Sequence, residues 1–157
     1  MTDSLAATRV LPPGDLSPLR RIRRVSRICA VTAALLDDDA DLLEILAELL
    51  QEHGCRCLQA RSLAELKALA PEVLEADVAV LDINLGSGAP TGIDAYTWLM
   101  SERFGGRILF LTGHAHAHPL VARAERLQRA AVLDKPIDGG ILIDRILGQT
   151  GSGAEAP

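Results

Sequence analysis

Five side chains of the sequence could together carry out chemistry on a phosphoryl group. Asp37, Asp38, Asp82, Thr112 and Lys135 each come at or just after the end of an apolar run. Clustered carboxylates repel one another unless a cation neutralises them, and an oxygen-only donor set suits Mg²⁺. A hydroxyl and an ammonium group beside such a cluster are typical of a site for a transferred phosphoryl group, with Asp82 as the nucleophile.

The elements that must position these side chains alternate between short apolar runs and helical patterns. Strands are expected at residues 28–36, 55–60, 78–81, 107–111 and 131–133. Helices are expected at residues 41–53, 62–70, 93–103, 119–129 and 141–147. Such alternation predicts an α/β fold, a parallel sheet with helices on both faces. Chemistry in such a sheet lies at the carboxyl ends of the strands, where all five side chains would converge.

The composition fits one folded domain with a basic extension. The chain has 157 residues, of which 48 % are hydrophobic, which excludes a wholly disordered or fibrous protein. We divide it into an N-terminal extension at 1–27, a domain at 28–148 and a short flexible tail at 149–157. Residues 1–30 contain six arginines and two aspartates, whereas the rest contains 10 basic and 19 acidic residues. An acidic body suits cation binding and disfavours direct DNA binding.

The basic extension and the cysteines leave several interpretations open. Residues 19–27 could form a short basic helix or an unstructured arm, which could bind a phosphate-rich surface, an acidic partner or the acidic rim of this chain. The apolar run at 28–36 has nine residues and is too short to span a bilayer, so no membrane insertion is expected. Three cysteines make no disulfide framework, which favours a reduced, cytoplasmic protein.

Four short motifs in order identify a resemblance. They are Leu35–Asp39, Val80–Leu85, Phe110–His114 and Leu133–Ile137. With them the sequence resembles the receiver domain of two-component response regulators, of the single-domain kind seen in chemotaxis response regulators, over residues 28–148. The resemblance implies a flavodoxin-like (βα)5 fold, a doubly wound parallel sheet with strand order 2-1-3-4-5.

The resemblance assigns a role to each motif residue. Asp82 matches the phosphoacceptor. Asp37 and Asp38 match the acidic pair that holds Mg²⁺, Asp38 directly and Asp37 more through water. Asp82 itself and the backbone carbonyl of Asn84 would complete the protein ligands. Asp39 is expected to cap the following helix instead of binding the metal.

The remaining motif residues concern the phosphoryl group and the conformational switch. Thr112 matches the switch hydroxyl, and Lys135 matches the lysine that pairs with the phosphoryl group. Asn84 and His114 match positions that tune how fast water removes that group. Val132 occupies the switch position where the family usually has an aromatic residue, so the aromatic half of the switch is missing.

A second departure lies in the loop after the acceptor. Residues 86–92 make this loop about two residues longer than is usual in the family, without the proline that normally comes after the leucine. Because the loop flanks the site, its length could alter the fit of a kinase or the lifetime of the phosphoryl group.

The expected function is that of a single-domain response regulator. Asp82 would accept a phosphoryl group, with Mg²⁺, from a histidine kinase or a histidine phosphotransfer protein, and the chain would signal through protein–protein contacts. We do not expect an enzyme acting on a separate substrate, and a homodimer is compatible with the family. The downstream target cannot be read from the sequence.

Other functions remain open. The chain could be a phosphate shuttle or sink, or a receiver-fold binding module that works without phosphorylation. A phosphatase with an aspartyl intermediate is disfavoured, because it usually needs a second acid where Asn84 stands. The three histidines at 114, 116 and 118, with Cys55 and Cys57, could suggest a transition-metal site. However, the cysteines fall on the second expected strand and the histidines in the loop after the fourth, well apart in the expected order.

Overall fold

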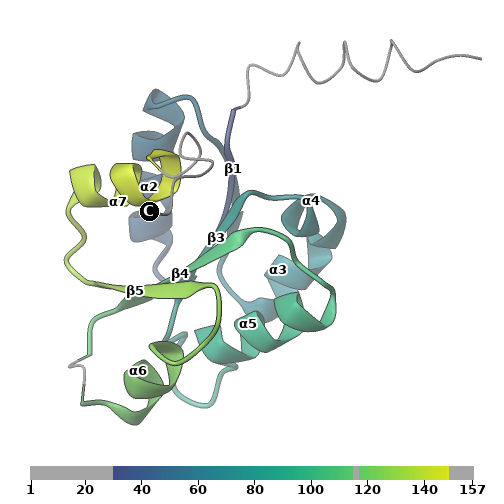
Figure 1. The fold of residues 1–157 in the computed structure, drawn as a ribbon, viewed down its shortest axis with the longest axis vertical. Coiled ribbons are helices and arrows are strands. Elements are labelled where there is room, and N and C mark those ends of the chain that lie inside the picture. The colour runs from purple at the N-terminus through teal and green to yellow at the C-terminus, as the bar shows by residue number, and fades with distance from the viewer. Residues whose placement is uncertain (1–29, 115–116, 149–157) are drawn as a thin grey trace, which may run out of the picture.

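The computed structural model describes residues 30–114 and 117–148, and it confirms the expected fold. The five strands form one parallel sheet in the order β2-β1-β3-β4-β5 (Figure 1). The strands are β1 Thr32–Leu36, β2 Arg56–Ala60, β3 Val78–Asp82, β4 Arg107–Thr112 and β5 Ala130–Asp134. The helices are α2 Ala40–Glu52, α3 Leu63–Ala68, α4 Ala70–Leu74, α5 Gly92–Ser101, α6 Pro119–Ala124 and α7 Gly139–Leu147. The predicted extension 1–27 and tail 149–157 lie outside the described residues.

Helices cover both faces of the sheet. α2 and α7 lie over one face, while α3, α4, α5 and α6 lie over the other (Figure 1). Each face has its own apolar core, and β3 is buried along its whole length between β1 and β4. A central parallel strand must be apolar on both sides, which explains why the run at 78–81 shows no polar alternation.

Two of the expected helices differ from the prediction. The helix expected at 62–70 ends at Ala68, and a separate short helix, α4, comes after it. Pro71 lies in the first turn of α4, where its missing N–H is tolerated, but it cannot continue the hydrogen bonds of α3.

The helix expected at 119–129 ends five residues early, at Ala124. Tertiary contacts hold the following residues out of the helix. Arg129 has a φ of +61°, and its guanidinium donates hydrogen bonds to the carbonyls of Phe104, Gly105 and Gly106. These contacts connect residues far apart in the sequence, so the local helical pattern could not reveal them.

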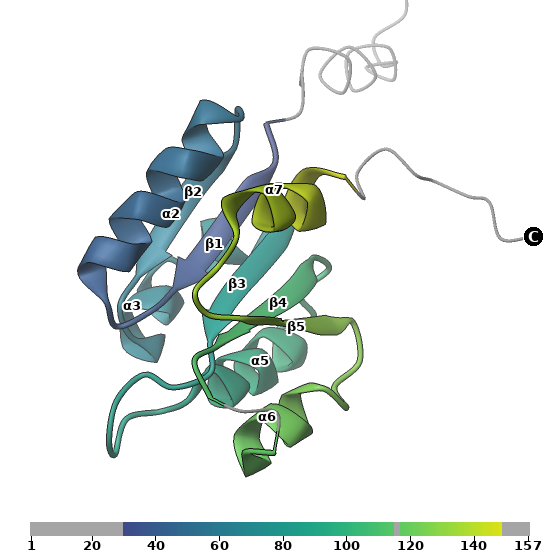
Figure 2. The same ribbon diagram turned by 90° about the vertical axis from the view of Figure 1, so that its left-hand side faces the viewer.

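The strand register sets the functional edge of the sheet. Leu36 pairs with Leu81, which places Asp37 beside Asp82 at the carboxyl ends of β1 and β3. Across β4, Thr112 pairs with Asp134, so Lys135 leaves β5 just beyond this edge. The loop after β3 projects from the same edge (Figure 2).

No helix in the described residues is long and apolar enough to cross a membrane.

Gly92 lets α5 begin directly against the end of β3. Its N–H donates a 3.0 Å hydrogen bond to the carbonyl of Ile83, and a Cβ at this position would collide with the carbonyl group of Asp82. Thr91 caps the helix in a capping box with Asp94. The backbone of the central aspartate therefore packs where only a glycine fits.

We predict that Gly92→Ala lowers the free energy of unfolding by about 1–3 kcal/mol, because the new methyl group must displace the backbone of Asp82. Urea denaturation followed by circular dichroism measures this loss. Gly105→Ala is the matched control, because a Cβ there meets nothing within 4 Å. Equal stability of the two variants would contradict the packing argument.

Candidate functional site

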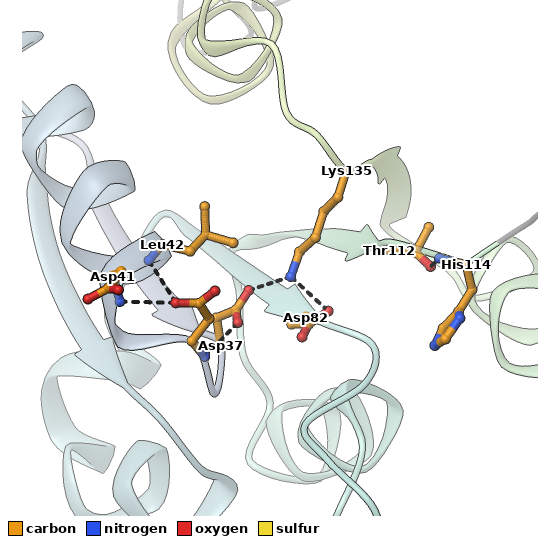
Figure 3. Close-up of polar contacts among 8 residues, drawn as sticks. Asp37, Asp41, Leu42, Asp82, Thr112, His114 and Lys135 are labelled. Atoms are coloured by element: carbon orange, nitrogen blue, oxygen red, sulfur yellow. Dashed lines mark hydrogen bonds and ion pairs between the residues drawn. The ribbon is translucent and has the colours of Figure 1, made fainter.

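The centre of the site is the ammonium group of Lys135, which lies between two carboxylates. Its Nζ is 2.7 Å from Oδ2 of Asp37 and 3.3 Å from Oδ1 of Asp82 (Figure 3). Asp37 is 1 % exposed and Asp82 is 5 % exposed, so little water screens these ion pairs. One cation therefore holds together the ends of three strands, β1, β3 and β5.

The backbone of Lys135 is anchored as well as its side chain. Its N–H donates a 2.7 Å hydrogen bond to the carbonyl of Thr112, which extends the pairing of β4 and β5 by one step. The lysine can therefore start at β5 and extend along the edge of the sheet past β4 to reach Asp82.

Three carboxylates form a compact oxygen cluster at the same edge. One carboxylate oxygen from each of Asp37, Asp38 and Asp82 lies within 4.8 Å of the others. Asp38 is exposed, so the cluster opens to solvent on its side. Hard oxygen donors that leave room for water are the donor set that Mg²⁺ prefers. The residues present thus fit a magnesium ion, with Asp38 as the accessible ligand.

The turn from β1 to α2 fixes the orientation of this acidic pair. Oδ1 of Asp37 accepts a 3.0 Å hydrogen bond from the N–H of Asp39. The side chain of Asp39 in turn accepts hydrogen bonds from the N–H groups of Asp41 and Leu42 (Figure 3). Asp39 therefore caps α2, as the sequence predicted, and it is not part of the three-carboxylate cluster.

The surroundings favour the protonated form of Asp82. Burial raises its pKa from 3.8 to about 6, and the negative charge of Asp37 contributes in the same direction. Lys135 and the N–H of Asn84 oppose this shift. For Lys135, burial by itself lowers the pKa, but the hydrogen bond to Asp37 and the charge of Asp82 outweigh it, so its pKa is raised. The surroundings therefore favour the charged form of Lys135, whereas the nearby positive charge does not offset the burial of Asp82.

Thr112 and His114 lie on the other side of Asp82 from Asp37 (Figure 3). Thr112 is 1 % exposed, and its Oγ1 accepts a 3.0 Å hydrogen bond from the N–H of His114. Nε2 of His114 lies 3.3 Å from Nδ2 of Asn84. Asn84 and His114, the two positions predicted to tune the loss of the phosphoryl group, are thus in contact with each other, and both are exposed. The role of the Asn84 carbonyl as a metal ligand stays a prediction.

The histidines and cysteines considered as a metal site lie on different parts of the sheet. The rings of His114 and His118 stack with their centres 4.6 Å apart, in the segment after β4. Cys57 lies on β2 at the far edge of the sheet, and Cys55 is buried beside it in the core under α2. Residue 116 lies outside the described residues.

An aromatic ring from α5 lies near Phe110, the residue that pairs with Val132. Val132 pairs with Phe110 on β4 and packs into the same core. The ring of Tyr96, on α5, lies 6.1 Å from that of Phe110, and its hydroxyl donates a hydrogen bond to the carbonyl of Gln128. β5 has a valine where the family usually has an aromatic residue, and an aromatic residue of α5, Tyr96, lies near the strand partner of that valine. The sequence alone did not connect these two positions.

Gly92 is the site residue that sequence reasoning missed. Its close packing against the carbonyl group of Asp82 helps to fix the position of the Asp82 backbone, from which the carboxylate extends. The signal available in the sequence was a threonine followed by a glycine at the start of a helix, which by itself does not show what the glycine packs against.

Known proteins resemble this chain in sequence and in fold. Residues 33–147 match the family model described as the response regulator receiver domain. The Photosynthetic apparatus regulatory protein RegA of Cereibacter sphaeroides is 33 % identical over 113 residues, which cover 72 % of this chain and 59 % of that protein. The chain therefore matches about three fifths of the length of that relative.

Solved structures show the same fold. A response regulator receiver protein from Sinorhizobium medicae has a TM-score of 0.60 at 27 % identity, over 76 % of this chain and 93 % of that chain. The chemotaxis protein CheY4 of Vibrio cholerae has a TM-score of 0.64 at 21 % identity, over 76 % of this chain and 100 % of that chain. With the family model matching most of its length, the chain belongs to the response regulator receiver domain family.

Proposed function

We propose that the chain is a phosphorylation-driven signalling switch that accepts a phosphoryl group on Asp82. The donor is a histidine of a sensor kinase or of a histidine phosphotransfer protein. A carboxylate oxygen of Asp82 forms the new P–O bond, while the P–N bond breaks and its electron pair stays on the donor imidazole. The chain acts only on its own phosphorylation state, not on a separate substrate, and it works in the cytoplasm.

The observation that supports this proposal best is the position of Lys135. Its ammonium lies 3.3 Å from Oδ1 of Asp82, where it can pair with oxygens of a phosphoryl group attached to that carboxylate. Magnesium held by Asp37, Asp38 and Asp82 would supply further positive charge for those oxygens. Asp82 is the carboxylate whose pKa is raised, so it gains most from such neutralisation.

The other site residues have supporting roles in the proposal. The Thr112 hydroxyl turns from its contact with the N–H of His114 to donate to a phosphoryl oxygen, which carries the change of state to the segment before α6. Asn84 and His114, in contact across the exposed side of the site, control the access of water. The output is protein–protein interaction, and a homodimer is one form it could take.

A binding module that works without phosphorylation is the second candidate. The observation in its favour is Val132, where the family usually has the aromatic half of the switch. Three clustered carboxylates and Lys135 argue against this second candidate. Placing charged groups close together and burying them costs free energy, and a module that only binds a partner does not need such a cluster. A phosphate shuttle or sink uses the same chemistry and differs only in where the phosphoryl group goes after Asp82.

Asp82→Asn is expected to abolish phosphorylation by a small phosphodonor, because the amide cannot form an acyl phosphate. The measurement is the intact mass of wild type and variant after incubation with phosphoramidate, with Mg²⁺ and with a chelator. Wild type should gain one phosphoryl group only with Mg²⁺. Asp144→Asn, an exposed change on α7, is the control and should behave as wild type. A mass gain in Asp82→Asn equal to that of wild type would disprove the assignment.

Asp38→Asn is expected to weaken Mg²⁺ binding by about tenfold or more, because it removes the accessible charged ligand of the cluster. Isothermal titration calorimetry with Mg²⁺ measures the change. Asp39→Asn is a closely matched control, one residue away and also exposed, since asparagine preserves the helix cap. If both variants bind Mg²⁺ as tightly as wild type, the ion does not lie in this cluster.

The raised pKa of Asp82 predicts a pH-dependent stability in Mg²⁺-free buffer. Because its pKa rises from 3.8 to about 6 on folding, the folded state binds this proton more tightly, and stability is lost as the pH rises through about 6. In Asp82→Asn this loss of stability is absent, because the amide does not ionise. The variant should unfold with a free energy about 1–3 kcal/mol higher than wild type at pH 8, a difference that declines as the pH falls towards 4.

Urea denaturation at pH 4 and pH 8 tests this prediction, with the exposed change Asp144→Asn as the control for overall charge. A stability difference between wild type and Asp82→Asn that is the same at both pH values would contradict it.

A further inference from the structure

An apolar groove lies along α2, on the outside of the molecule. It has a volume of about 360 Å³, with Leu42, Ile45 and Leu49 on the α2 side and Lys135, Pro136 and Ile137 on the other. Ile45 is 60 % exposed, although it lies in a helix with a well-buried opposite face. Of the large hydrophobic side chains in the described part of the chain, only Ile45 and Ile141 are exposed.

An acidic stripe borders this groove. Four exposed carboxylates succeed one another at helical spacing along α2, next to Ile45. They belong to Asp41, Glu44, Glu48 and Glu52. Within residues 30–114 and 117–148, no ion pair to any of these four is found. The groove therefore combines a largely apolar floor with a negative edge that no residue in the described part of the chain pairs with.

One segment of the chain has the complementary pattern. Residues 19–27 read Leu-Arg-Arg-Ile-Arg-Arg-Val-Ser-Arg. Leu19, Ile22 and Val25 recur every third residue, so in a helix they would lie on one side, and five arginines fill most of the remaining positions. The segment thus offers an apolar stripe edged by positive charge, opposite in sign to α2.

The segment can reach the groove. Val31 packs into the same core as Leu50 of α2 and Ile146 of α7, so the chain enters the fold beneath the α2–α7 layer. α2 has 13 residues and is therefore about 20 Å long. If residues 28 and 29 are extended, the three Cα–Cα steps from Arg27 to Ala30 span about 10 Å, and a helix of the nine residues 19–27 would add about 13 Å, enough to extend along most of α2.

We propose that the segment Leu19–Arg27 docks in the groove between α2 and residues 136–139, with its apolar side chains on the floor and its arginines against the acidic stripe. The charge pattern favours this occupant over a second copy of the domain, because two acidic stripes would repel. The proposal concerns contacts within one chain and does not depend on phosphoryl transfer.

Photocrosslinking in the full chain tests the docking. With p-benzoylphenylalanine in place of Ile22, irradiation should give crosslinks within one chain to residues 42–49 or 136–139, mapped by mass spectrometry. Their yield should not change when the protein is diluted a hundredfold. The same residue in place of Val10, outside the segment, is the control and should show no preference for the groove. Crosslinks between two chains, or crosslinks scattered over the surface, would overturn the proposal.

A charge exchange supplies a second test in the same full chain. Arg20→Glu with Arg24→Glu should lower the crosslink yield from position 22 by about fivefold, because attraction to the stripe becomes repulsion. Adding Glu44→Arg and Glu48→Arg should restore it. Glu72→Arg with Glu75→Arg, on or beside α4 on the opposite face, is the matched control and should restore nothing. A crosslink yield that is the same in wild type and in all three sets of variants would also overturn the proposal.

Discussion

The ion pairs of Lys135 with Asp37 and Asp82 are the constraint on which this structure depends. Two buried carboxylates at the ends of neighbouring strands repel each other, and Lys135 is the cation that the described residues place between them. That cation must come from β5, the edge strand, so β4 has to hold β5 in register for the ammonium to arrive. Any slip of β5 would leave two uncompensated charges in a poorly solvated place.

The two apolar cores and the starts of α2 and α5 hold the strand ends where Lys135 can reach both carboxylates. Apolar cores on both faces of the sheet fix the strands, and the carboxyl ends of β1 and β3 are left to carry charge. Gly92 allows α5 to start against the backbone of Asp82, and Asp39 starts α2 beside the acidic pair. The site is thus built from the ends of strands and helices, and the loop that follows β3 is exposed at residues 86–90.

The aromatic packing at the β5 edge of the sheet involves a residue that the resemblance did not single out. Val132 leaves less volume on β5 than an aromatic residue would, and Tyr96 on α5 packs near its partner Phe110. The hydroxyl of Tyr96 also ties α5 to the turn before β5. The aromatic ring near this end of the sheet therefore comes from α5 and not from β5.

The sequence alone determined the fold class, the strand order by resemblance, and the set of side chains at the strand ends, because apolar runs and the polar residues that end them are local patterns. It could not determine that Lys135 lies between Asp37 and Asp82, since that depends on the register of strands far apart in the chain. The early end of α6, the packing of Gly92 on Asp82 and the approach of Tyr96 to Phe110 have the same origin. Each depends on contacts between distant segments, and only the packed tertiary structure decides which distant atoms meet.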